Sequence, residues 1–347
     1  MEMPLQHRKI ITIWLILGAT LVFLMVAIGG ITRLTHSGLS MTDWNLFMGS
    51  IPPLTETDWS ASFEHYQQFP EFKELNYNFT LEDYKSIFWW EYIHRALGRL
   101  LGLVFLFPFI FFLLKGWLSP IRKKQFLILF LMGGFQAFLG WFMVKSGLVD
   151  MPRVSHFRLA AHLLMAFMTC LYISWLILEI NLPRTKSLAH EFGFRKQAIG
   201  IFILVVIQSV YGAFVAGLKA GWVHNTFPLM DGQIISDAVF VMEPIYLNFI
   251  EGKSGVQFIH RLLGISALVW VVVFYFKGIR SVVDRFQVLS VRMVFIAALL
   301  QVSLGIATLM MEVPISFAIL HQVGALFLLI SLVFTIHRFT PPSIQKN

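Results

Sequence analysis

Two stretches of the sequence place a histidine and an arginine side by side within a long apolar run. They are EYIHRALGR at residues 91–99 and QFIHRLLG at residues 257–264. A neutral imidazole is a metal ligand that suits an apolar environment, and two imidazoles on facing helices can bind a haem iron from opposite sides. The first chemistry that these motifs indicate is therefore haem binding by His94 and His260.

Two further histidines follow the same internal repeat. FQAFLGWFM at 135–143 aligns with LQVSLGIAT at 300–308, and LAAHLLMAF at 159–167 aligns with FAILHQVGALF at 317–327. We predict that His94 pairs with His162, and His260 with His321, as the axial ligands of two haem irons. A proton or ion pathway lined by the same four histidines is the alternative.

The two halves differ one helical turn before the first histidine. Glu91 precedes His94 by three residues on the same helical face, whereas Gln257 takes that position before His260. An acid within a membrane is costly and marks a functional site by default, although a glutamate at the interface can also extend outward to water. A carboxylate beside a haem can accept protons or stabilise a developing positive charge. We therefore predict chemistry in the N-terminal half and electron transfer in the C-terminal half.

Arg95 and Arg261 directly follow the first histidine of each half. Two interpretations fit them equally: they bind haem propionates, or they extend to lipid headgroups. Gln136 and Gln301 are expected to hydrogen-bond between helices. Cys170 is the single cysteine, so a disulfide within the chain is excluded and a buried packing role is expected.

The composition requires a membrane protein to position these residues. Apolar residues make up 57% of the chain and charged residues 13%, with a mean hydropathy of +0.72, whereas a soluble globule has about 25% charged residues. Crossing a bilayer takes about 20 apolar residues. The stretches that reach this length are 10–32, 87–114, 123–145, 157–179, 196–217, 256–277, 291–311 and 315–337. The sequence predicts an all-α membrane protein whose eight transmembrane helices form two pseudo-symmetric four-helix bundles, in residues 1–180 and 181–347.

The distribution of charge predicts the orientation of these helices. Lysine and arginine cluster near both termini and in alternate connections, while the connection 33–86 holds eight acidic and three basic residues. By the positive-inside rule both termini are cytoplasmic, and connections 33–86, 146–156 and 218–255 face outward. The four histidines then lie at similar depth near the outer ends of their helices. The net charge of +8 is thus a sign of topology, and nucleic acid is not expected as a partner.

Other polar residues of the outer connections are expected to be solvated. Among the acidic ones, Glu71, Glu74, Glu82 and Asp83 are interpreted as a polar cover. The histidines given the same interpretation are His36, His65 and His156. The segment WNLFMGSIPPL at 44–54 is predicted to lie along the membrane surface, where it shields the N-terminal haem or forms the route by which substrate enters.

Several motifs in order along nearly the whole chain resemble those of haem A synthases. They are GGITRLTHSGLSM at 29–41, EYIHRALGR at 91–99, GWFMVKSGL at 140–148, NTFPLMDG at 225–232 and FIHRLLG at 258–264. The resemblance is to the branch with a long first outer loop, found in mitochondria and many Gram-negative bacteria. Another branch has a cysteine pair in that loop. This chain lacks the pair, which excludes thiol chemistry there.

The resemblance implies an oxidoreductase that converts the C8 methyl group of haem O into a formyl group, making haem A for terminal oxidases. It implies that the haem O or haem A lies between His94 and His162 beside a catalytic Glu91, and that a haem b lies between His260 and His321. Water and dioxygen both stay open as the oxygen source, and water is preferred because two axial histidines leave the iron no free position. Haem O synthase and cytochrome oxidase assembly factors are the protein partners it suggests.

The main alternative function is a dihaem cytochrome b that transfers electrons from quinol. This alternative does not explain the difference between Glu91 and Gln257. A haem transporter or chaperone is a third interpretation, and it predicts weaker haem retention and no conversion. Few residues precede the first helix, and none resembles a transit peptide. This favours the bacterial inner membrane over the mitochondrial inner membrane.

Overall fold

The computed structural model describes residues 3–42, 51–145, 154–184, 191–281 and 284–341. Within these ranges the regular structure is helical, and pairing between extended segments is limited to an isolated bridge between Met230 and Gln233. The predicted all-α class is confirmed.

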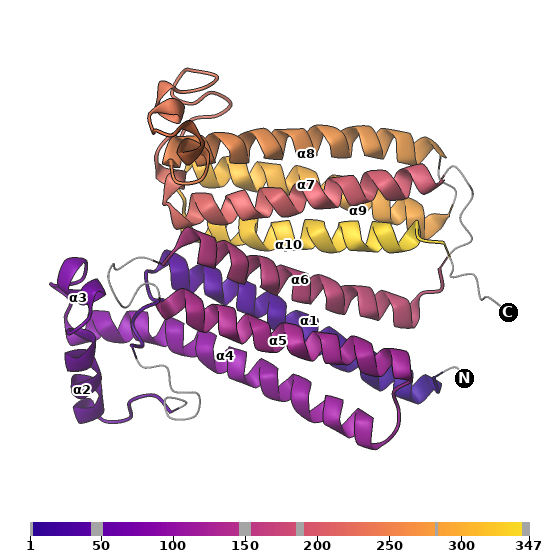
Figure 1. Cartoon of the computed structure of the whole chain (residues 1–347), viewed down its shortest axis with the longest axis horizontal. Helices are drawn as coiled ribbons and strands as arrows, with labels where there is room; N and C mark the ends of the chain where they lie inside the picture. Colours follow the sequence, from indigo (N-terminus) through magenta and orange to yellow (C-terminus); the bar gives the residue numbers. More distant parts are fainter. Residues whose placement is uncertain (1–2, 43–50, 146–153, 185–190, 282–283, 342–347) are drawn as a thin grey trace. The chain divides into compact units, whose positions relative to one another are not determined.

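Eight of the helices are long and apolar enough to cross a membrane (Figure 1). They are α1 (Leu5–Leu34), α4 (Leu81–Leu114), α5 (Pro120–Lys145), α6 (His156–Asn181), α7 (Glu191–Gly217), α8 (Lys253–Ser281), α9 (Arg285–Met310) and α10 (Ile315–Arg338). Each coincides with one of the spans predicted from hydropathy, as in a multi-pass membrane protein, and α9 ends one residue before the predicted end at residue 311. The cytoplasmic position of the termini and the pseudo-symmetry of two bundles stay predictions.

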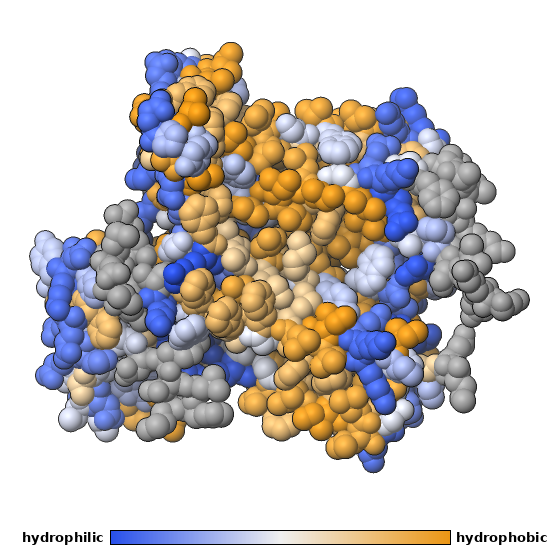
Figure 2. All heavy atoms as spheres, in the orientation of Figure 1, coloured by the Kyte–Doolittle hydropathy of each residue, from blue (hydrophilic) through white to orange (hydrophobic). Residues whose placement is uncertain are grey.

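Apolar side chains cover the outside of the long helices rather than only their packed faces. Leu114 is 82% exposed, Leu131 60% and Val269 58%. Figure 2 shows that apolar side chains dominate the length of the helices, while hydrophilic ones gather at their ends. This pattern fits a lipid environment, because lipid tails do not penalise an apolar surface.

The chain divides into two compact units, Thr20–Ala166 and Met1–Ala19 with Phe167–Asn347. The boundaries between these units fall within α1 and α6. The division into two domains between residues 180 and 181 stays a prediction. In the second unit, α7, α8, α9 and α10 run alongside one another (Figure 1), and the contacts α7–α8, α8–α9, α9–α10 and α10–α7 close a four-helix ring. Such a ring can hold a cofactor between facing helices.

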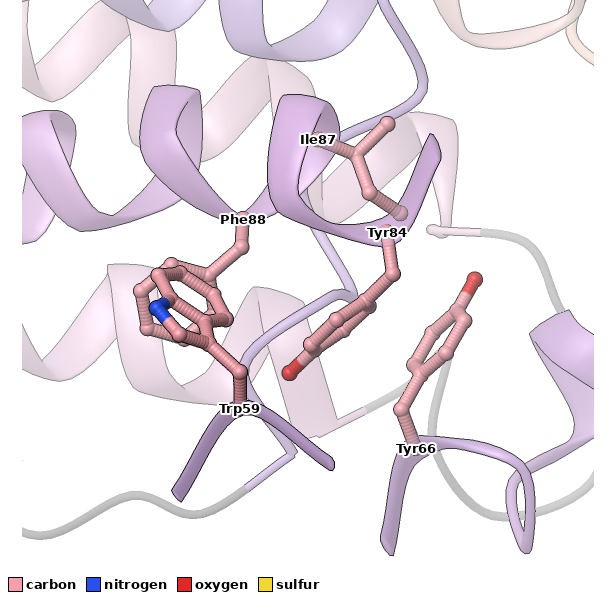
Figure 3. Close-up of a cluster of buried hydrophobic side chains, with 5 residues drawn as sticks. All are labelled: Trp59, Tyr66, Tyr84, Ile87 and Phe88. Atoms are coloured by element: carbon pink, nitrogen blue, oxygen red, sulfur yellow. The ribbon is translucent and has the colours of Figure 1, made fainter. Parts of the chain in front are cut away.

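In the unit Thr20–Ala166 the connection between α1 and α4, called the first outer loop after its predicted orientation, folds into two short helices, α2 (Glu56–Tyr66) and α3 (Pro70–Glu74), at the start of α4. A capping box fixes the N-terminus of two helices. Thr55 and Asp58 form it at α2, and Thr80 and Asp83 form it at α4. Aromatic side chains of α2 and α4 form a buried cluster (Figure 3). Its buried members are Trp59, Tyr66, Tyr84, Ile87 and Phe88. The predicted surface segment 44–54 falls largely on residues 43–50, outside the described residues.

The outer connection between α7 and α8 is organised differently. It consists of three single turns, η1 (Ala220–Trp222), η2 (Asp237–Phe240) and η3 (Ile245–Phe249). The Asn248 side chain connects η3 to the chain that follows η2, because it accepts from the backbone N–H of Met242 and donates to the carbonyls of Met242 and Ile245. Hydrogen bonds therefore hold this loop where an aromatic cluster holds the first.

Candidate active site and haem-binding histidines

Each of the four predicted ligand histidines lies against a glycine of the preceding long helix. The pairs are Gly29 with His94, Gly140 with His162, Gly212 with His260 and Gly305 with His321. A Cβ built on these glycines would lie 3.0, 3.1, 3.2 and 2.7 Å, respectively, from the Cε1 atom of the imidazole. A side chain at these positions would crowd the rings, so the glycines help to set the orientation of all four imidazoles.

The second pair of histidines has the separation expected for two ligands of one iron. The ring centres of His260 and His321 are 6.4 Å apart, and the ring planes are inclined at 83°. A metal bound at about 2 Å from each imidazole nitrogen separates the ring centres by roughly 6 Å. His321 Nδ1 lies 3.1 Å from the carbonyl oxygen of Gln301, and this hydrogen bond leaves Nε2 as the nitrogen for a metal.

The first pair is similar in its surroundings. His94 and His162 are close enough to interact electrostatically, and Gln136 of α5 lies 3.2 and 3.3 Å from the two ring nitrogens of His162 on α6. The predicted hydrogen bond of Gln136 between helices is confirmed, and its partner is a candidate ligand. Among the described residues, Nδ1 of His94 and of His260 are buried atoms without a hydrogen-bond partner.

These observations fit haem and not a compact metal site. The described residues contain no group of three or more histidine, cysteine, aspartate or glutamate side chains that could hold a metal ion. Paired imidazoles that face each other are instead the donor set of a six-coordinate haem iron. The residues present therefore fit one haem in each unit.

Glu91 is buried, with 3% of its surface exposed, and its carboxylate is enclosed by donors. Ser40 Oγ and the backbone N–H of Met41 donate to Oε2 at 2.7 and 2.8 Å, and Arg95 donates to Oε1 at 2.5 Å. Arg95 also donates to the carbonyl of Met41 at 2.7 Å. The alternative of a glutamate extending outward to water is therefore wrong, and Arg95 points to Glu91 and the chain after α1.

Gln257 repeats this arrangement without the negative charge. It is 2% exposed, its Nε2 donates to the carbonyl of Ala220 at 2.9 Å, and its Oε1 accepts from Arg261 at 3.1 Å. Arg261 also donates to the carbonyl of His224 at 2.6 Å, as Arg95 does to that of Met41. Both arginines donate to a carbonyl of the loop in their own unit. These contacts do not fit the alternative in which the arginines extend to lipid headgroups, and binding of haem propionates stays a prediction.

His224 anchors the outer loop between α7 and α8. Its Nδ1 lies 2.6 Å from Asp231 Oδ2, and its Nε2 lies 3.0 Å from Ser254 Oγ. The hydrogen bond with His224 lowers the pKa of Asp231 below its ordinary value. The imidazole thus connects the loop to the first turn of α8.

Two residues expected to be solvated are buried. Glu71 is 5% exposed, because α3 turns its side chain inward to the hydroxyl of Tyr66 at 3.1 Å. His156 is 7% exposed and packs against the Phe157 ring, with ring centres 4.1 Å apart. The prediction was right for His36 and Glu74, which are exposed. Hydropathy alone does not distinguish the buried members of a polar loop.

Several residues of the site were not found from the sequence. Ser40 and Met41 lie in the motif at 29–41, which indicated the family but not the contact with Glu91. Gln208 lies on α7, where its Nε2 is 3.4 Å from His260 Nε2 and donates to the His260 carbonyl at 2.8 Å. The position of Gly212 four residues later, on the same helical face, was the available sign. Cys170 is buried, as predicted.

Comparisons with known proteins show the family of this chain. Residues 12–333 match the family model described as cytochrome oxidase assembly protein. A protein of Flavobacterium johnsoniae named heme A synthase is 44% identical over 339 residues, covering 96% of this chain and 99% of its own. The proteins of that name from Flavobacterium psychrophilum and Nitrosospira multiformis are 44% and 41% identical, over 97% and 95% of this chain and 100% and 93% of their own. The chain therefore belongs to the haem A synthase family.

Proposed function

We propose that this protein converts haem O into haem A by oxidising the C8 methyl group of the substrate to a formyl group. The observation that carries the proposal is the buried carboxylate of Glu91, one helical turn before His94, at a position where the other unit has the neutral Gln257. An electron carrier has no use for this difference. A reaction that releases protons beside one of the two haems, in contrast, needs a carboxylate at that haem only.

In this proposal haem O lies between His94 and His162. The paired imidazoles hold the substrate by its iron, and the glycines beside them, Gly29 and Gly140, allow the rings to stand at a defined orientation. Arg95 is kept in place by Glu91 and the Met41 carbonyl, from where its remaining charge can attract a propionate. Arg261 has the corresponding position in the other unit.

The proposed chemistry takes its oxygen from water. Conversion of a methyl group and one water molecule into a formyl group releases four protons and four electrons. Glu91 stabilises the positive charge that develops on the substrate and accepts a proton from the attacking water. Dioxygen is less favourable, because two axial imidazoles leave no position on the iron.

The second unit supplies the route by which the four electrons leave, one at a time, to an external electron acceptor. His260 and His321 would bind a haem b, which when bound transfers electrons singly. Gln257 and Arg261 orient the helix that bears His260 through hydrogen bonds that involve no carboxylate. The absence of a carboxylate at residue 257 suits a haem that exchanges only electrons.

The proposal places the protein in the bacterial inner membrane with both termini in the cytoplasm. The relatives reported above are bacterial, and the basic connections follow the positive-inside rule. Haem O is a membrane-soluble substrate, so haem O synthase and cytochrome oxidase assembly factors are the proposed protein partners.

Haem extraction and chromatography of the purified, detergent-solubilised protein test the proposal. Wild type supplied with haem O should yield haem b and haem A, and Glu91→Gln should yield haem b with haem O or a hydroxylated intermediate. Haem b alone from both proteins would make the chain an electron carrier and overturn the proposal. Weak retention of all haem would instead favour a transporter.

The oxygen source is tested separately with isotope-labelled water. Mass spectrometry of the hydroxylated intermediate should show label from water. Label derived from dioxygen would overturn the water route while leaving the conversion itself intact.

A further inference from the structure

The two units differ at a second position, on the helix that packs against the first histidine of each unit. Gly29 of α1 and Gly212 of α7 both face the imidazole of that histidine at close range. Four residues earlier, on the same helical face, α1 has Met25 and α7 has Gln208. An apolar thioether in one unit therefore takes the place of a carboxamide in the other.

Contacts with the histidine helices place these two side chains at matching positions. Gly98 follows His94 by four residues, and a Cβ built on it would lie 3.6 Å from Met25 Cε. Gly264 follows His260 by four residues, and a Cβ built on it would lie 3.1 Å from Gln208 Nε2. Each side chain thus reaches the turn of the helix that follows the histidine.

Gln208 links α7 directly to the histidine of α8. Its Nε2 donates to the backbone carbonyl of His260 at 2.8 Å and lies 3.4 Å from His260 Nε2. In an α-helix this carbonyl accepts from the N–H of residue 264, and the absence of a side chain on Gly264 leaves room for the amide as a second donor. The bond to the carbonyl does not involve the ring, so it is compatible with iron binding by either ring nitrogen.

Met25 makes no bond of this kind, because a thioether has no hydrogen to donate. A hydrogen bond between α1 and α4 occurs instead one helical turn before His94. There Thr32 Oγ1 donates to the carbonyl of Trp90 at 3.3 Å, in addition to a shorter bond of 2.9 Å to Ile28 of its own helix. The link between helices is thus on the ligand residue in the second unit and beside it in the first.

The second histidine of each unit differs in the same direction. His321 Nδ1 lies 3.1 Å from the main-chain carbonyl of Gln301, whereas the ring nitrogens of His162 lie 3.2 and 3.3 Å from the side-chain amide of Gln136. A carbonyl within a helix has a fixed position, while a glutamine side chain can adopt several rotamers. Main-chain groups therefore take part in holding both histidines of the second unit.

We propose that Gln208 is a positioning residue that retains the haem of the second unit, and that Met25 at the matching position lets the haem of the first unit exchange. Release requires an imidazole to move off the iron, and the hydrogen bond from α7 resists movement of His260. The inference rests on the proposed function for the identity of the two haems. A substrate and its product must enter and leave the site of His94, whereas a haem b that only transfers electrons stays bound.

Timed release of haem from the full-length protein in detergent tests this inference. The protein is supplied with haem O, purified, incubated with excess apomyoglobin and separated from it, and the haems that remain are identified by chromatography. Wild type should lose haem O and haem A, counted together, faster than haem b. Gln208→Met should release haem b about fivefold faster and leave the other rate unchanged, since one hydrogen bond is lost. Met25→Gln should slow the release of haem O and haem A by a similar factor and leave haem b unaffected.

The matched control is Ser209→Ala, which removes a neighbouring hydroxyl of α7 that donates to the Val205 carbonyl of its own helix at 2.8 Å. It should leave both rates unchanged. Gly264→Ala and Gly98→Ala form a second pair of variants should Gln208→Met fold poorly. The Cβ of the first would crowd the Gln208 amide at 3.1 Å and should speed the release of haem b, whereas that of the second, at 3.6 Å from Met25, makes an ordinary contact and should change neither rate.

Three results would overturn the inference. They are equal rates of loss for the two kinds of haem from wild type, an unchanged release of haem b from both Gln208→Met and Gly264→Ala, and an equal acceleration for all haems in those variants. The last would mean that the substitution loosens the whole protein and does not act on His260. Retention of haem O by wild type without any formation of haem A would remove the proposed function, and the two release rates would still decide the role of Gln208 and Met25.

Discussion

The two units of this protein place an arginine, a histidine and an outer-loop carbonyl in matching positions, but only one of them adds a carboxylate. Arg95 is paired with Glu91 and the Met41 carbonyl, whereas Arg261 is paired with Gln257 and the His224 carbonyl. Hydrogen bonds that involve no carboxylate are therefore sufficient in the second unit to hold the helix and its histidine. The carboxylate of Glu91 has no counterpart there, which supports the chemical role proposed for it.

The outer loops differ in a related way. The first is held by an aromatic cluster that also buries Glu71, and the second is held by hydrogen bonds around His224 and Asn248. The apolar cluster beside Glu91 lowers the local dielectric constant, which strengthens the electrostatic interactions of a charge at that site. Gln257 is neutral, so the hydrogen-bonded loop beside it encloses no corresponding negative charge.

Removing an axial histidine should have the largest effect and should separate the two units. His321→Ala should weaken the binding of haem b by at least about tenfold, because the iron would lose one of its two protein ligands. His162→Ala should keep haem b and lose the haem O or haem A. The amount of each haem per polypeptide, determined by chromatography, measures both losses.

The matched control for this experiment is His36→Asn, at an exposed histidine with a φ of 55° that asparagine tolerates. It should retain both haems. Loss of both haems in each single variant would mean that the two sites are not independent.

Exchanging Glu91 and Gln257 should have the next largest effect on activity. Glu91→Gln should lower haem A formation by about 100-fold or more, because the proton acceptor is lost. Gln257→Glu should destabilise the protein by about 1–3 kcal/mol, since a carboxylate oxygen would face the carbonyls of Ala220 and His224. Haem chromatography and thermal unfolding report these changes.

The double exchange decides whether position alone confers the chemistry. We expect it to be inactive, because Gln257→Glu lacks the Ser40 and Met41 donors that surround Glu91. Recovery of haem A formation in the double variant would mean that the two units are interchangeable.

Adding a methyl group beside the histidines should produce a smaller, graded effect. Gly305→Ala would place a Cβ 2.7 Å from the His321 ring, closer than the 3.2 Å of Gly212→Ala beside His260. The first should shift the haem b spectrum and cost about 1–3 kcal/mol of stability, and the second less. Gly134→Ala has no atom within 4 Å of its new Cβ and is the control, expected to leave the spectrum unchanged.

The outer loops should respond to pH in opposite directions, which is the smallest of these effects. The pKa of Glu71 is raised by burial to about 8, so its loop is most stable at low pH and loses stability as pH rises from the ordinary value towards 8. The hydrogen bond of His224 lowers the pKa of Asp231, so its contribution is present above the ordinary value and is lost as pH falls below it.

Hydrogen exchange of peptides from the two loops, corrected for the intrinsic pH dependence of exchange, measures this contrast. Glu71→Gln should flatten the response of the first loop and Asp231→Asn that of the second, each without altering the other. A shared direction in both loops would contradict the assigned causes.

The sequence by itself determined the membrane class and the eight long helices, and it predicted the histidine pairs. Each of these follows from a local pattern: a run of apolar residues sufficient to cross a bilayer, or a histidine repeated at a matching place in both halves. The same repeat made the difference between Glu91 and Gln257 visible, because it supplied an internal reference for one residue. The motifs in the chain were also sufficient to indicate the family.

Only the tertiary structure decided which polar groups meet. Ser40 lies 51 residues before Glu91, and Glu71 looks like its exposed neighbour Glu74 in any local pattern. Burial of one and not the other depends on how α2 and α3 pack their aromatic rings on α4, which is a property of contacts between distant segments. Local patterns specify helices and faces, whereas the enclosure of a charge is decided by packing from several segments at once.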